Sequence, residues 1–117
     1  MKRDMELIRL ILLDAEDETE VDLSQFPSEQ INYHKWLLLE RGFIDGFSSS
    51  STGGRDVIVK SLTWEGHEFL DDARDDKVWK EAMKQLGRHA GSASLDVLKA
   101  LLATVATQML TGGQHAP

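Results

Sequence analysis

Residues 62–86, LTWEGHEFLDDARDDKVWKEAMKQL, decide the fold, because their apolar side chains change face partway along the stretch. Thr63 has the side chain of a helix N-cap, and Glu65 falls in the first turn, where an acidic residue is favourable. On a helix of about 100° per residue, two apolar groups lie nearly opposite one another: Phe69, Leu70 and Ala73 in the first half, and Trp79, Ala82, Met83 and Leu86 in the second. A straight helix would therefore bury one face in its first half and the other face in its second.

Two arrangements satisfy this pattern. The helix can break near residues 74–77, with Asp75 or Asp76 capping a second helix, or one long helix can pass between two packing partners. No glycine or proline marks a break, so we favour one long helix, bent or straight.

The segment HEFLDDARDD, residues 67–76, raises the question of a metal site. His67, Asp71 and Asp75 follow one another at i, i+4 spacing, so one histidine and two carboxylates share a helix face. A catalytic zinc ion needs three good ligands and an open position, and aspartate replaces the second histidine of a zinc-protease pattern here. Because these residues lie away from the apolar face, we interpret them as a solvated helix face and expect no metal and no cofactor.

Two further helices are predicted upstream. Residues 2–15 carry apolar side chains at helical spacing, and residues 28–41 form a second helix with Ser28 as its N-cap and Gly42 as its stop signal. We interpret His34, on the apolar side of that helix, as a hydrogen-bonded core histidine rather than a metal ligand. The acidic run between the helices predicts a solvated turn, with a short strand over residues 20–23.

The remaining segments predict a hairpin and a C-terminal helix. Residues 43–62 alternate as in a β-hairpin whose tip is SSSSTGG. Ser94 caps a helix over residues 94–110 that is apolar nearly all round, which predicts burial by its own domain or by a second copy of the chain. In the second case the candidate self-association residues are Leu98, Leu102, Val105 and Met109.

The amino-acid composition limits the classes of function that this protein can have. The chain has 117 residues, enough for one domain. It contains no cysteine, and this absence excludes a disulfide scaffold and a thiolate metal site and fits a reducing cytoplasm. Charged residues interrupt the N-terminal apolar stretch, so we expect no signal peptide, and no segment approaches the roughly 20 apolar residues of a membrane span. The net charge of −7 disfavours a phosphate backbone unless the basic residues are sharply segregated.

The order helix, helix, hairpin, helix resembles winged-helix proteins. More closely, residues 2–110 resemble the YjcQ-like family of small uncharacterised bacterial and phage proteins. Four motifs carry this resemblance: KRDMELIRLILL (2–13), YHKWLLLERGFI (33–44), LTWEGHEFLDDARDDKVWK (62–80) and SLDVLKALLA (94–103). The resemblance implies a mainly α fold with a small β-hairpin (α+β), winged-helix-like with additional C-terminal helices, and frequent phage or prophage origin. It implies no established activity and no catalytic residues.

On this basis we expect three parts. A winged-helix-like domain spans residues 1–86, including the long helix after the wing; residues 87–110 form a linker and an apolar helix that packs on that domain or on a second copy; residues 111–117 are a tail. Only about a dozen residues separate the first two helices, so residues 28–41 would be the recognition helix, with a minimal or absent partner helix.

Two function classes remain open for this arrangement. The candidate partner- or DNA-contacting residues are Asn32, Tyr33, Lys35, Trp36, Arg55 and Lys60. Against DNA binding, acidic residues share the outward side of the second helix and few cations lie there. Tyr33 and Trp36 are anchor-type residues for a protein partner, although Trp36 can instead pack on the C-terminal helix.

We therefore favour a non-enzymatic regulatory or interaction protein over a winged-helix DNA-binding regulator. The acidic balance suits a basic protein partner, such as a host nucleic-acid enzyme, and the resemblance suggests phage or prophage association. No glycine-rich phosphate loop and no nucleophile with an adjacent base is present, which disfavours an enzyme.

Overall fold

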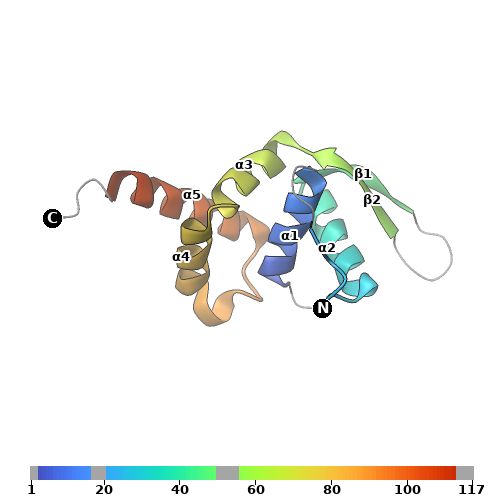
Figure 1. The fold of residues 1–117 in the computed structure, drawn as a ribbon, viewed down its shortest axis with the longest axis horizontal. Coiled ribbons are helices and arrows are strands. Elements are labelled where there is room, and N and C mark those ends of the chain that lie inside the picture. Colours follow the sequence, from blue (N-terminus) through green and yellow to red (C-terminus); the bar gives the residue numbers. More distant parts are fainter. Residues whose placement is uncertain (1–2, 17–20, 50–55, 113–117) are drawn as a thin grey trace.

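The computed structural model describes residues 3–16, 21–49 and 56–112. Their elements follow the order α1 (Met5–Glu16), α2 (Ser28–Glu40), β1 (Ile44–Ser49), β2 (Asp56–Leu62), α3 (Trp64–Ala73), α4 (Asp76–Leu86), the 3-10 turn η1 (Gly87–His89) and α5 (Leu95–Gly112). The molecule is elongated, with the hairpin at one end and α4 and α5 at the other (Figure 1). This confirms the predicted mainly helical α+β fold with a small antiparallel hairpin.

Helix α1 is the centre of the core. Its apolar stripe is fully buried, and it contacts α2, α3 and β2. The buried side chains with at most 1% exposure are Leu7, Ile8, Ile11 and Leu12. The predicted amphipathic helix is confirmed, although it begins at Met5 rather than at residue 2.

Helix α2 ends as the sequence predicts but begins differently. Gly42 adopts φ +76°, and the N–H groups of Gly42 and Phe43 donate to the carbonyls of Leu39 (3.2 Å) and Leu38 (2.9 Å), which is a Schellman stop. At the other end Pro27 is the N-cap and no side chain caps the helix, so the prediction that Ser28 is the cap was wrong. The short strand over residues 20–23 is also wrong where the structure describes it, because residues 21–23 are irregular.

The favoured long helix over residues 63–86 was also wrong. The chain forms α3 and α4, and Asp75 caps α4 by accepting hydrogen bonds from the N–H groups of Lys77 (2.9 Å) and Val78 (3.1 Å). The reversal of the apolar face is real: Phe69, Leu70 and Ala73 are buried on α3, as are Trp79, Ala82 and Leu86 on α4. The break lets both faces reach one core.

Arg9 of α1 stabilises this break from a distance in sequence. Its guanidinium donates to the carbonyls of Ala73 (2.7 Å) and Arg74 (3.1 Å), which the end of α3 leaves without helical partners. The same group pairs with Asp76 at 2.7 Å and lies 5.3 Å from the centre of the Trp79 ring. Arg9 thus stabilises a helix break at which the sequence has neither glycine nor proline.

The hairpin contains a β-bulge. Asp45 pairs with Ser61 but Gly46 pairs with Val59, so Lys60 is an extra residue on β2. The bulge shifts the alternation of the strand, and Val57 and Leu62 therefore both face the core although they are five residues apart. On the outer face, the paired residues Phe47 and Ile58 are exposed.

The hairpin passes into α3 through close backbone packing. The Phe43 carbonyl accepts a hydrogen bond from the N–H of Thr63 (3.1 Å), and the Thr63 hydroxyl caps α3 by accepting from the N–H of Gly66 (3.0 Å). A Cβ atom on Gly66 would lie 2.0 Å from the Phe43 oxygen. Only glycine at this position allows α3 to approach the Phe43 backbone, just before β1, so closely.

Helix α5 packs on α3 and α4 of its own chain. The hydroxyl of Ser94 accepts from the N–H of Val97 (3.1 Å), which confirms the predicted cap. Three of the four predicted self-association residues, Leu98, Leu102 and Val105, are at most 1% exposed in this packing. These three are covered by α3 and α4 of the same chain, whereas Met109 is 39% exposed, and self-association through residues 94–110 stays a prediction.

His34 is a core histidine, as predicted. Its side chain is fully buried; Nδ1 donates to the Gln30 carbonyl (2.8 Å) and Nε2 accepts from the Asp4 N–H (2.7 Å). These two partners fix the neutral tautomer with the proton on Nδ1, because a carbonyl can only accept and an N–H can only donate. Burial lowers the pKa of His34, against the opposing effect of the Gln30 hydrogen bond.

Stability is therefore expected to fall as the pH drops below about 6.5, the ordinary histidine value. Below that pH the unfolded chain takes up a proton that folded His34 does not, so the free energy of unfolding declines by up to about 1.4 kcal/mol per pH unit until the folded pKa is reached. Urea midpoints at pH 7.5, 6.5 and 5.5 measure this slope. The slope should shrink in His34→Asn and persist in the control His67→Gln, since His67 is exposed. An unchanged slope in His34→Asn would show that another group is responsible.

Candidate interaction surface

The predicted site residues on α2 are less available than the sequence suggests. The Asn32 amide ties α2 to the start of β2, because its oxygen accepts from the Val57 N–H (3.3 Å) and its nitrogen contacts an Asp56 carboxylate oxygen at 3.4 Å. Tyr33 and Trp36 are half-buried, with ring centres 6.5 Å apart, and Trp36 packs against the core. These contacts indicate structural roles for all three.

The predicted cations do not come together into a basic patch within the described residues. Lys35 is half-buried on α2, and Lys60 is exposed at the bulge of β2. Arg55 lies outside the residues that the structure describes. Within the described residues, α2 and the hairpin therefore carry little accessible positive charge.

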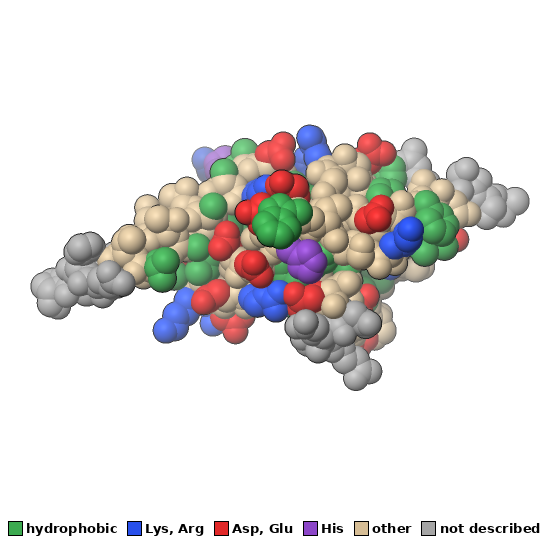
Figure 2. All heavy atoms as spheres, turned by 90° about the horizontal axis from the view of Figure 1, so that it is seen from above, with side chains coloured by type: hydrophobic (Ala, Val, Ile, Leu, Met, Phe, Trp, Pro, Cys, Tyr) green, Lys and Arg blue, Asp and Glu red, His purple; other side chains and the backbone are tan. Residues whose placement is uncertain are grey.

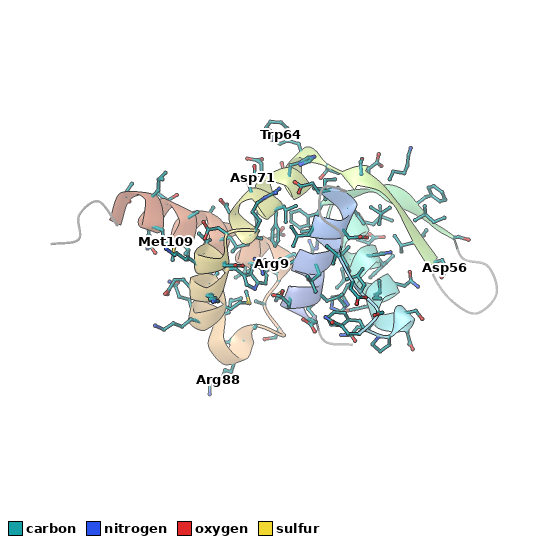
Figure 3. The ribbon with its side chains drawn as sticks, in the orientation of Figure 1. Arg9, Asp56, Trp64, Asp71, Arg88 and Met109 are labelled. Atoms are coloured by element: carbon teal, nitrogen blue, oxygen red, sulfur yellow. The ribbon has the colours of Figure 1, made fainter. Side chains whose placement is uncertain are left out.

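Trp64, which the sequence did not single out, is the most exposed large apolar side chain in the described structure. It is 76% exposed at the first position of α3 and projects away from the body of the molecule (Figure 3). Trp64 and the buried Ala73 are nine residues apart, which places them on opposite sides of a helix at about 100° per residue. This helical phase could have identified Trp64 from the sequence alone.

Acidic side chains follow Trp64 along the same exposed face. Residues 64–76 contain six carboxylates and one arginine. Glu68 and Asp71 lie one and two helical turns beyond Trp64, and both are exposed. Figure 2, which views this side, shows acidic groups gathered around an isolated exposed hydrophobic side chain over α3. We call Trp64, His67, Glu68 and Asp71 the α3 face.

Ion pairs neutralise only part of this charge. Lys99 of α5 contacts Glu65, and Asp71 lies 3.8 Å from an Arg74 nitrogen. Burial, together with the neighbouring carboxylates of Asp71 and Glu68, raises the pKa of the Asp72 carboxyl. The α3 face thus carries more negative charge than its cations balance, which makes it attractive to a cation.

The two aspartates nearest the helix break have local structural partners. Asp75 caps α4, and Asp76 pairs with Arg9, which lowers the pKa of the Asp76 carboxyl. Within the described ranges, no group of three His, Cys, Asp or Glu side chains is arranged to hold a metal ion.

Positive charge gathers on the outer side of α4. Lys77, Lys80 and Lys84 recur at helical spacing on α4, Arg88 follows in the 3-10 turn η1, and all four are exposed. None of them forms a salt bridge in the part of the chain that the structure describes. We call these four residues the α4 stripe; in Figure 3 its end, Arg88, lies on the side opposite Trp64.

These features define a small α+β protein with an exposed tryptophan among carboxylates on α3. Residues 2–93 match the family described as hypothetical protein DUF2513, and the chain belongs to this family. It is also 38% identical over 117 residues to an uncharacterized protein of Haemophilus influenzae, covering 94% of this chain and 99% of that one. No solved structure gives a significant match. The chain is thus a member of an uncharacterised small-protein family, and neither the YjcQ-like name nor the winged-helix class is confirmed.

No helix in the described part of the chain is long and apolar enough to cross a membrane.

Proposed function

We propose that this protein is a non-enzymatic interaction module that binds a basic segment of a protein partner through the α3 face. The observation that carries the proposal is Trp64, which is 76% exposed and is followed along its helix by carboxylates. An exposed tryptophan that makes no contribution to the core has no evident structural purpose at this position.

The chemistry of the α3 face favours lysine or arginine. A cation over an indole ring gains about 0.5–1 kcal/mol at exposed sites and more when the pair is desolvated. Carboxylates beside the ring add charge attraction and steer a basic partner toward it. Tryptophan is among the residues that most often dominate binding energy at protein interfaces.

The regulatory role and the phage or prophage association belong to the same proposal. They rest on the resemblance in sequence, together with the net charge of −7. A basic host protein, such as a nucleic-acid enzyme, is the class of partner that an acidic regulator of this size suits best.

Binding of a fluorescein-labelled peptide rich in lysine and arginine tests this proposal. Trp64→Ala is expected to weaken the affinity about tenfold, because it removes the aromatic anchor while leaving the core intact. Val97→Ala is the matched control, since Val97 is also an exposed apolar side chain (52%) but lies on α5. Fluorescence polarisation at about 0.15 M salt measures the affinity, and circular dichroism verifies the fold of each variant.

A second pair of variants separates the α3 face from the general acidity of the protein. One double variant, Glu68→Gln with Asp71→Asn, removes two exposed carboxylates from the α3 face. The other, Glu29→Gln with Glu40→Gln, removes two exposed carboxylates from α2. Only the first pair should weaken binding strongly. Equal losses from both pairs, with no loss in Trp64→Ala, would mean that net charge alone attracts the peptide and that the α3 face is not the site.

The α4 stripe favours a second candidate function, nucleic-acid binding. Four exposed cations can neutralise phosphates. They lie on α4 and in the η1 turn after it, at the far end of the molecule from the hairpin, so a recognition-helix-and-wing interface of the winged-helix type would not use them (Figure 1). Retention of duplex DNA at physiological salt, lost in Lys80→Gln with Lys84→Gln, would favour this candidate over the first.

A further inference from the structure

A groove lies where the α3–α4 break meets the C-terminal half of α5. Its volume is about 400 Å³. One side is acidic and is lined by Asp71, Asp72 and Asp75, with Lys77 as the one cation in the lining. The other side is apolar and includes Val78 of α4 and the α5 residues Met109 and Leu110.

The α5 part of the apolar side is left uncovered by the described chain, whereas Val78 is buried. Val105 is buried against α3 and α4, but α5 continues beyond these helices, and Met109 and Leu110 are 39% and 72% exposed. In Figure 1 the last turns of α5 extend past α4. Exposed apolar side chains at the rim of a groove are a common feature of binding sites.

The groove continues from the α3 face. Asp71 belongs to both, because it lies two turns beyond Trp64 on α3 and also lines the groove. Figure 3 shows Trp64, Asp71 and Met109 on successive parts of the molecule, from the start of α3 toward α5. One bound segment can therefore contact the aromatic anchor and the groove together.

We propose that this groove binds a short basic amphipathic helix of the partner protein, with its apolar stripe on Leu110 and Met109 and its cations on Asp71 and Asp72. This inference rests on the proposed function and names the kind of segment bound. The lining consists of helices without a strand edge, which favours a helix laid into the groove over a peptide added to a sheet. Three aspartates against one lysine select a positively charged occupant.

Three labelled 14-residue peptides test the occupant. The first has leucine at positions i, i+3, i+4 and i+7 and lysine elsewhere; the second replaces its leucines with serine; the third replaces its lysines with glutamate. The first peptide is expected to bind at least tenfold more tightly than the second, because only the first can bury apolar surface in the groove. The third is expected to show no measurable binding. Equal affinity for the first two would overturn the proposal.

Leu110→Ser tests the place of binding. This substitution is expected to weaken the affinity for the first peptide about tenfold and to leave the affinity for the second peptide unchanged. The control is Val97→Ser, at an exposed position near the start of the same helix, which should change neither affinity. A loss in Trp64→Ala with none in Leu110→Ser would overturn the groove and leave the proposed function standing. A loss in Leu110→Ser with none in Trp64→Ala would support the groove and contradict the α3 anchor.

A second copy of the chain is the competing occupant. Sedimentation of the protein without peptide distinguishes the two. A wild-type dimer that becomes a monomer in Leu110→Ser would show that the groove is an interface between copies, and this would overturn the proposal. A monomer in both cases, with tight binding of the first peptide to the wild type, supports it.

Discussion

Replacing Gly66 with alanine is expected to destabilise the protein by about 4 kcal/mol or more, a loss that few single substitutions cause. The added Cβ would lie 2.0 Å from the Phe43 oxygen and 3.0 Å from the Phe43 carbonyl carbon. Both are backbone atoms, and the same oxygen accepts the hydrogen bond from Thr63 that joins the hairpin to α3. Relief of the clash requires α3 to move away from the Phe43 backbone, which opens the core.

Gly42→Ala is the matched control for this prediction. Gly42 has φ +76° but open space around it, so alanine there brings backbone strain of about 1–2 kcal/mol and no clash. Urea unfolding followed by circular dichroism should rank Gly66→Ala far below Gly42→Ala. A Gly66→Ala protein as stable as Gly42→Ala would mean that α3 does not pack against Phe43 in this way.

Replacing Arg9 with alanine is expected to cost about 3 kcal/mol of stability. The side chain is only 13% exposed and donates to two carbonyls at the end of α3, so its removal leaves the part-buried Ala73 carbonyl without its partner. Its contact with the Trp79 ring is lost as well. Arg9→Lys should recover only part of the loss, because an ammonium group lacks the fork that reaches both carbonyls.

Arg41→Ala provides the comparison. Arg41 is 54% exposed and its ion pair with Asp96 is 3.7 Å long, so its removal should change the free energy of unfolding by no more than about 0.5 kcal/mol. Thermal and urea unfolding measure both variants. If Arg9→Ala were as mild as Arg41→Ala, the account of the helix break would be contradicted.

Local sequence signals predicted most of the secondary structure. Gly42 marks the end of α2, Thr63 and Ser94 cap their helices, and the reversal of apolar face along residues 62–86 is present in the structure. Each signal acts within a few residues of the feature that it specifies. For that reason each can be read from the chain without knowledge of the fold.

The errors at Ser28 and at residues 21–23 are local, but others come from contacts between distant segments. The break between α3 and α4 depends on Arg9, which is more than 60 residues away in the chain. No local sequence pattern predicts that contact. Asn32 was expected to face a partner, but it is held by β2. The sequence left open whether α5 packs on its own domain or on a second copy, and in the structure it packs on α3 and α4 of its own chain.

The aromatic residues that the sequence offered as anchors differ from the tryptophan that the structure exposes most. An acidic surface with an aromatic anchor was expected on α2 with Tyr33 and Trp36, whereas the exposed tryptophan is Trp64 on α3. The segment HEFLDDARDD was correctly placed on an exposed helix face for its first half. Its last two aspartates have structural partners at the break, which only the tertiary structure reveals.

We propose that the α3 face binds a basic segment of a protein partner. A ¹H–¹⁵N NMR titration with the leucine–lysine peptide tests it most directly, because the three tryptophan indoles give separate signals in one spectrum. We predict that the Trp64 indole and the backbone amides of residues 64–72 shift, while the buried Trp79 indole does not. Shifts confined to α2 and the hairpin, or to the α4 stripe, with the Trp64 indole unmoved would contradict the account.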